Sequence, residues 1–106
     1  MDWNEYQEWT RTTAVYDKRD EFPYLLTGLS GEVGELLSIY AKMYRGDPNP
    51  ATLGDAVEKE LGDILWFVAR LADARGTDLQ SIVDKNVAKL EDRKARNKIQ
   101  GSGDDR

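Results

Sequence analysis

Apolar residues recur every three or four positions along most of the chain, the spacing that places them on one face of an α-helix. Alternation with a period of two never persists, so no strand is predicted. Pro23 suits the first turn of a helix and Gly76 is a typical residue after a last turn. Thr77 with Gln80 reads as a capping box. The pattern predicts four helices, at about residues 2–17, 23–44, 53–74 and 77–96.

Short connections between these helices predict an all-α fold, an antiparallel four-helix bundle. The stretch Gly46-Asp47-Pro48-Asn49-Pro50 is a loop on composition. We expect one domain over residues 1–100 and a polar, Gly-rich tail, residues 101–106, that is either flexible or covers a site. A bundle this small with so many apolar helix faces is expected to complete its core by oligomerisation, as a homodimer or homotetramer.

Composition narrows the chemistry. The 106 residues include no Cys and no His, which excludes disulfides, thiolates and the commonest zinc ligand and general base. A formal net charge of -5 argues against binding a nucleic acid polymer or a membrane surface. No apolar run is long enough to cross a bilayer and no signal-peptide core is present, so a cytoplasmic location is expected.

Two pairs of acids lie on the apolar side of the second and third helices. On a helical wheel at ~100° per residue, Glu32 shares the sector of the apolar residues of its helix, and Glu35 borders it. Glu60 and Asp63 repeat the arrangement in the third helix. Most acids at this spacing are solvated helix edges, yet neither pair has a basic residue in its own sector. Antiparallel packing would bring both pairs to one point.

Four carboxylates in a partly dry site repel one another and resist ionisation unless a cation neutralises them. Oxygen ligands without His or Cys favour Mg²⁺, with Mn²⁺ as a substitute, over zinc or copper. Di-iron bundles use a Glu-x-x-His motif, which is impossible here. Since Mg²⁺ usually bridges carboxylates to substrate phosphates, a phosphorylated ligand is predicted.

The fourth helix supplies cations for such a ligand. Asn86, Lys89 and Arg93 share a sector with apolar residues, and Lys42 follows Glu35 by two turns on nearly the same face. Stems of Lys and Arg that lie along the edge of a core give the same pattern. Together with the acids, these residues predict a polyphosphate site.

Gly31 and Gly34 fall inside the second helix, where each glycine costs about 1 kcal/mol relative to Ala. Close approach of another helix or of a ligand would account for both.

The blocks "GLSGEVGELL", "KELGDILWFVARLA", "NVAKLEDR" and "GSGDDR" together resemble the MazG-like all-α nucleoside triphosphate pyrophosphohydrolases, from Gly28 onward. The resemblance implies Mg²⁺-dependent hydrolysis of a (deoxy)nucleoside triphosphate to the monophosphate and pyrophosphate, in nucleotide-pool housecleaning. It implies dimers or tetramers with sites built across subunits. The metal ligands and catalytic residues it implies are Glu32, Glu35, Glu60 and Asp63. The substrate contacts are Lys42, Asn86, Lys89 and Arg93, with Ser102, Asp104 and Arg106 from a tail that folds over a neighbouring site.

Some points stay open. Many relatives carry an acid where this chain has Gly31, which leaves the identity of the base open: either Glu32 or Glu35 is the base, or a metal-bound hydroxide needs no separate base. The substrate's base is not specified; Trp3, Tyr6, Trp9, Tyr24 and Trp66 are candidates for stacking, although such aromatics are more often core residues. The alternatives are a phosphoribosyl-ATP pyrophosphohydrolase and a non-catalytic bundle that binds metal or a partner.

Overall fold

The structure, a computed structural model, describes residues 1–47 and 53–106. All regular structure in these two ranges is helical, which confirms the all-α class, and no helix within them is long and apolar enough to span a membrane. The helices are α1 (Trp3–Thr10), α2 (Glu21–Arg45), α3 (Leu53–Ala74) and α4 (Leu79–Ala95), with the 3₁₀ turns η1 (Arg11–Thr13) and η2 (Lys18–Asp20) between α1 and α2.

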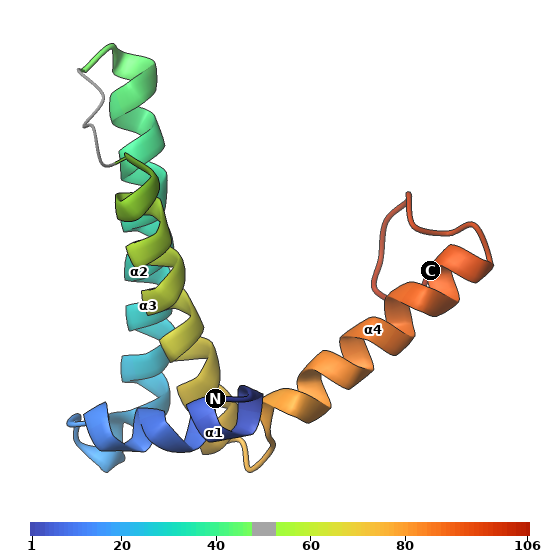
Figure 1. Cartoon of the computed structure of the whole chain (residues 1–106), viewed down its shortest axis with the longest axis horizontal. Helices are drawn as coiled ribbons and strands as arrows, with labels where there is room; N and C mark the ends of the chain where they lie inside the picture. Colours follow the sequence, from blue (N-terminus) through green and yellow to red (C-terminus); the bar gives the residue numbers. More distant parts are fainter. Residues whose placement is uncertain (48–52) are drawn as a thin grey trace.

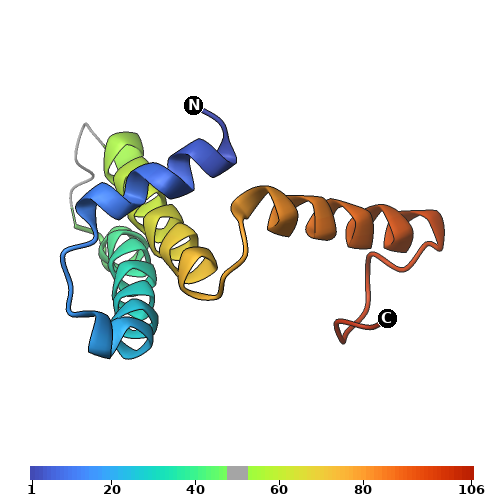
Figure 2. The same ribbon diagram turned by 90° about the horizontal axis from the view of Figure 1, so that it is seen from below.

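The two longest helices, α2 and α3, run side by side in opposite directions, and α1 crosses one end of the pair (Figure 1). The helix α4 leaves from that same end and points away from α2 and α3, as both views show (Figure 2). Its main helix contact is with α1. A single chain therefore forms the expected antiparallel pair but not a bundle of all four helices, because the turn at Gly76, with φ +73°, redirects the chain.

The core lies where α2 and α1 meet α3. Leu25 of α2 and Phe67 of α3 are buried, and a Cβ on Gly28 would lie 2.3 Å from the Phe67 ring. Gly28 is therefore what allows α2 to approach this ring. A second cluster joins α3, α4 and α1 through Ala69, Ala72 and Leu79, with Tyr6 and Val68 packed against it.

The predicted extent of the first helix was wrong. The α-helix ends at Thr10, not near Asp17, and continues only as a 3₁₀ turn. The hydroxyls of Thr10, Thr12 and Thr13 each donate to the main-chain carbonyl three residues earlier. Such local bonds compete with helix continuation, and apolar spacing does not reveal them.

The predicted Thr77 cap was also wrong. Asp78 caps α4, since its carboxylate accepts from the Ser81 amide at 2.9 Å. The buried Gln7 of α1 supports the same turn: its side chain donates to the Thr77 carbonyl and accepts from the Leu79 amide. The predicted bounds of α3 match the structure, and the predicted loop begins at Gly46, which ends α2 with φ +92°. Residues 48–50 of that loop lie outside the described residues.

An ion-pair network holds α1 and the start of α2 against α3. The guanidinium of Arg70 is 1% exposed and pairs with Asp73 at 2.9 Å and with Glu21 at 3.8 Å. Arg11 of η1 pairs with the same Asp73 at 2.7 Å, and Tyr16 accepts from Arg70 through its hydroxyl at 3.2 Å. Arg70 therefore serves packing and does not neutralise the acids of the site.

The glycines of α2 give a matched test of packing. We expect Gly28→Ala to lower the free energy of unfolding by about 1–3 kcal/mol, because the new methyl group meets the buried Phe67 ring. Gly34→Ala should raise it by about 0.5–1 kcal/mol, since no atom of the described residues lies within 4 Å of the new Cβ. Urea unfolding of both variants checks the contrast.

Close approach among the residues that the structure describes does not explain Gly34, nor Gly31, which is equally open. We hypothesise that a partner subunit or a ligand approaches α2 closely at these two glycines. If it holds, Gly34→Ala weakens self-association or activity; a more stable variant with full activity and unchanged assembly would refute it.

Candidate metal site

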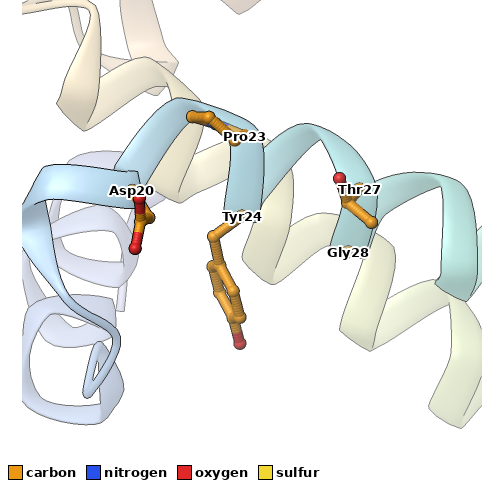
Figure 3. A pocket seen from close by; sticks show the side chains of 5 residues that line it. All are labelled: Asp20, Pro23, Tyr24, Thr27 and Gly28. Atoms are coloured by element: carbon orange, nitrogen blue, oxygen red, sulfur yellow. The ribbon is translucent and has the colours of Figure 1, made fainter.

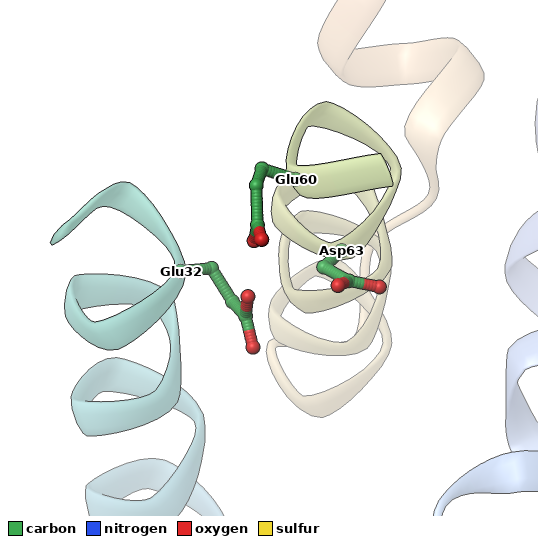
Figure 4. A group of neighbouring side chains, drawn as sticks. All are labelled: Glu32, Glu60 and Asp63. Atoms are coloured by element: carbon green, nitrogen blue, oxygen red, sulfur yellow. The ribbon is translucent and has the colours of Figure 1, made fainter. Parts of the chain in front are cut away.

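Three carboxylates from two helices converge between α2 and α3. One oxygen each of Glu32, Glu60 and Asp63 lies within 4.8 Å of the others. Figure 4 shows Glu32 of α2 and Glu60 of α3 directed into the space between the helices, with Asp63 further along α3. The antiparallel pairing of the helices produces this convergence, because it sets the apolar sectors that contain the acids against each other.

Two oxygens of this cluster lack protein partners. Glu32 Oε2 and Glu60 Oε2 are both buried, and neither has a hydrogen-bond partner in the described part of the chain. A buried carboxylate oxygen without a donor costs free energy, so such groups are normally paired or bind a cation. The pair of oxygens is therefore the feature of this site that points to a ligand.

The cluster disfavours the ionisation of Glu32. Burial, the contact with Glu60 and the charges of Glu35, Asp63 and Glu60 together raise the pKa of Glu32 to about 7, from an ordinary value of 4.5. A carboxyl that resists ionisation beside other carboxylates is the electrostatic environment that a divalent cation relieves. Three convergent oxygen ligands without nitrogen or sulfur fit a hard cation. The cluster is thus a possible divalent-metal site.

Glu35, the fourth predicted ligand, lies outside this cluster. Its side chain is exposed on α2, although its charge is close enough to raise the pKa of Glu32. The helical wheel places Glu35 at the border of the apolar sector, and its exposure agrees with that position.

The pKa of Glu32 gives the metal-free protein a defined pH dependence. Between pH 4.5 and about 7, the folded protein binds more protons at Glu32 than the unfolded chain does, so stability falls as the pH rises through this window. We expect a loss of about 1–2 kcal/mol from pH 5 to pH 8, allowing for solvent screening of a half-exposed group. The chain has no His to titrate in this window.

Urea unfolding in EDTA at several pH values measures this dependence. Glu32→Gln should flatten the profile, whereas a profile equally steep in wild type and variant would show that another group is responsible.

The predicted phosphate contacts lie apart from the acids. Lys42 is exposed on α2, near its end. Asn86 and Lys89 border a hollow of about 270 Å³ on α4, together with Ile82 and Lys85. The helix α4, which carries these residues, extends away from α2 and α3, which carry the carboxylates (Figure 1).

The C-terminal tail lies against α4. Asp104 accepts from Lys89 and Arg93, two of the predicted phosphate contacts. Arg106 donates to main-chain carbonyls of the same segment, and Ser102 is exposed.

The candidate aromatic residues fall into different settings. Trp66 donates to the Thr13 hydroxyl at 2.7 Å and is part of the packing between α3 and the N-terminal segment. Tyr24 borders a hollow of about 380 Å³ with Asp20, Pro23, Thr27 and Gly28 (Figure 3). Trp3 and Tyr6 border another, of about 410 Å³, with Met1 and Asp2. Trp9 stacks on Tyr6 with ring centroids 6.1 Å apart.

Tyr6 has a relation to the acids that sequence reasoning missed. Burial and, secondly, the charge of Asp63 raise the pKa of its phenol. The sequence predicts Tyr6 only as a candidate for stacking on a base. Its proximity to Asp63 depends on how α1 crosses α3. No spacing in the sequence signals that crossing.

The fold and the site define an all-α protein that carries a possible divalent-metal site between its two long helices. The chain belongs to the MazG family: the model of the MazG nucleotide pyrophosphohydrolase domain matches residues 21–97, which include α2, α3 and α4. It is 37% identical over 109 aligned residues to the Gene 37 protein of Mycobacterium phage L5, with 95% of this chain and 96% of that protein covered. No solved structure matches.

Proposed function

We propose that this protein hydrolyses (deoxy)nucleoside triphosphates to the monophosphate and pyrophosphate in a Mg²⁺-dependent reaction, as cytoplasmic nucleotide-pool housecleaning. The observation that carries the proposal is the pair of buried, unpaired carboxylate oxygens of Glu32 and Glu60, in a chain of the nucleotide pyrophosphohydrolase family. Buried carboxylate oxygens without donors are costly to the fold, which is understandable where they serve a ligand.

The carboxylates hold the metal in this proposal. Glu32, Glu60 and Asp63 are the ligands of Mg²⁺, for which Mn²⁺ can substitute, and Glu35 is either a further ligand or the base. When bound, Mg²⁺ neutralises the triphosphate and lowers the pKa of a water for attack on phosphorus. The carboxylates fix the position of that chemistry, and the helices α2 and α3 hold them rigidly.

The basic and polar residues bind the substrate. Lys89 and Arg93 contact phosphates, Asn86 hydrogen-bonds the substrate or orients a ligand, and Lys42 contacts the triphosphate from α2. The tail residues Ser102 and Arg106 contact phosphate or ribose, and Asp104 contacts ribose.

A homodimer or homotetramer is part of this proposal, because α4, which carries the cations, extends away from the helices that carry the acids of the same chain. A second copy can supply them. Large apolar side chains that a partner would cover are exposed on α2 and α3, namely Leu26, Val33, Leu37, Tyr44 and Leu61. Sedimentation equilibrium tests this directly, and a monomer at micromolar concentration that turns over substrate would contradict it.

The test of the function is an assay with Mg²⁺ over a panel of nucleoside triphosphates, in which monophosphate, diphosphate, phosphate and pyrophosphate are resolved. We expect monophosphate and pyrophosphate in equal amounts, and the panel ranks the bases. Diphosphate with phosphate would contradict cleavage between the α and β phosphates.

Absence of turnover with every nucleotide would also contradict the proposal. Turnover of phosphoribosyl-ATP alone would then favour that alternative, and metal binding without any turnover would favour a non-catalytic bundle.

A further inference from the structure

The C-terminal tail places a carboxylate on the two cations of α4. Lys89 Nζ lies 3.0 Å from Asp104 Oδ1, and a guanidinium nitrogen of Arg93 lies 3.2 Å from the same oxygen. Arg93 also donates to the main-chain carbonyl of Asp104. A single anionic oxygen is therefore shared by two cationic side chains one helical turn apart.

Hydrogen bonds of Arg106 hold the rest of the tail in a conformation that brings Asp104 to α4. Arg106 donates to the carbonyls of Lys98, Ile99 and Gly103, and its own carbonyl accepts from Arg96. Gly103 adopts φ +85°, a backbone conformation that favours glycine. These bonds close residues 98–106 into a loop that returns Asp104 to α4.

Burial is unequal across the contact. Arg93 is only 4% exposed, whereas the side chain of Asp104 is 78% exposed. The cation is thus fixed and the anion lies open to solvent, where ion pairs contribute little stability.

We propose that the tail is a displaceable latch: Asp104 occupies an anion site formed by Lys89 and Arg93, and a phosphate group of the ligand takes the place of its carboxylate. The carboxylate oxygen stands in for a phosphate oxygen, which also accepts from two cationic donors. The proposal rests on the proposed function only for the choice of phosphate as the ligand.

The variant Asp104→Asn tests the effect of the carboxylate charge while it keeps a side chain of nearly the same shape. It removes the carboxylate charge from the cations but keeps the main-chain carbonyl to which Arg93 donates, so the tail can retain its path. Asp105→Asn is the matched control, since it changes the net charge equally at an exposed neighbouring residue. Pyrophosphate without metal is the probe, because it has phosphates but no ribose or base.

Calorimetric titration of the full chain with pyrophosphate in EDTA tests the latch. We expect Asp104→Asn to bind pyrophosphate roughly two- to five-fold more tightly than wild type, the equivalent of one exposed ion pair. Asp105→Asn should match wild type, and Lys89→Gln/Arg93→Gln should lose the binding. Equal affinity in Asp104→Asn and Asp105→Asn, or weaker binding in the former, would overturn the proposal.

A second measurement follows the tail itself. In the wild-type protein, saturating pyrophosphate should move the amide resonances of Gly101 and Gly103 toward those of the Lys89→Gln/Arg93→Gln variant, in which the latch has no partner. Unchanged resonances at saturation would show that phosphate and tail do not compete, and would also overturn the latch.

Neither measurement requires turnover. If the latch opens with pyrophosphate but no nucleotide is hydrolysed, the proposed function fails and the anion site stands. If nucleotides are hydrolysed while Asp104→Asn leaves pyrophosphate affinity unchanged, the latch alone fails.

Discussion

Glu32→Gln is expected to abolish turnover of nucleoside triphosphates. Glu32 contributes one of the two buried oxygens that lack a donor in the described part of the chain, and the cluster raises the pKa of its carboxyl to about 7. The fall in activity caused by Glu32→Gln should exceed the ~10–100-fold fall that follows substitution of a residue that only hydrogen-bonds a metal ligand. Steady-state kinetics with Mg²⁺ measure it, and Glu58→Gln, which alters an exposed acid of α3, is the control.

The same variant should not weaken the metal-free fold. Removing one of several like charges relieves repulsion, so at pH 8 in EDTA Glu32→Gln should be as stable as wild type or more stable. Mg²⁺ should raise the melting temperature of wild type and Glu58→Gln, because it binds only the folded state, and should raise that of Glu32→Gln far less. A destabilised Glu32→Gln with a normal response to Mg²⁺ would mean that the carboxylates are structural.

Asp73→Ala should cause the largest loss of stability of any substitution considered. Asp73 is the closest carboxylate to the buried Arg70, and it also accepts from Arg11 and Gln7. Arg11 and the other donors hold the pKa of Asp73 well below its usual range. Removing the carboxylate leaves a buried guanidinium only partly compensated by Glu21, which typically costs about 3–5 kcal/mol.

Two variants control this result. Arg11→Ala removes an exposed partner of the same carboxylate and should cost about 1 kcal/mol or less. Arg70→Met/Asp73→Ala should recover much of the loss, because no buried charge is left unpaired. If urea unfolding gives Asp73→Ala a free energy of unfolding within about 1 kcal/mol of wild type, the buried Arg70 does not depend on Asp73 and the network contributes little to stability.

The features of this fold that depend on one helix or on two neighbouring helices could be predicted from the sequence. The bounds of α3 were predicted because its apolar spacing is regular and Gly76 ends it. Glu32, Glu60 and Asp63 could be placed together because helical periodicity and antiparallel pairing are enough to bring them face to face. Each of these inferences needs only one helix and its immediate neighbour.

The features that depend on distant residues were not predictable. Arg70 is buried, and its guanidinium donates to Tyr16 and Asp73, of which Tyr16 is far away in sequence. The direction of α4 depends on a turn and on contacts with Gln7 rather than on the pattern within the helix. The contact of Asp104 with Lys89 similarly depends on how the tail turns back.

Binding of Mn²⁺, followed by electron paramagnetic resonance, tests the central claim most directly, since the free ion gives a signal that binding broadens. At pH 8, wild type and Glu58→Gln should remove Mn²⁺ from solution, and Glu32→Gln/Glu60→Gln should leave it free. Equal binding by the double variant, with its fold intact, would show that the cluster between α2 and α3 is not the metal site.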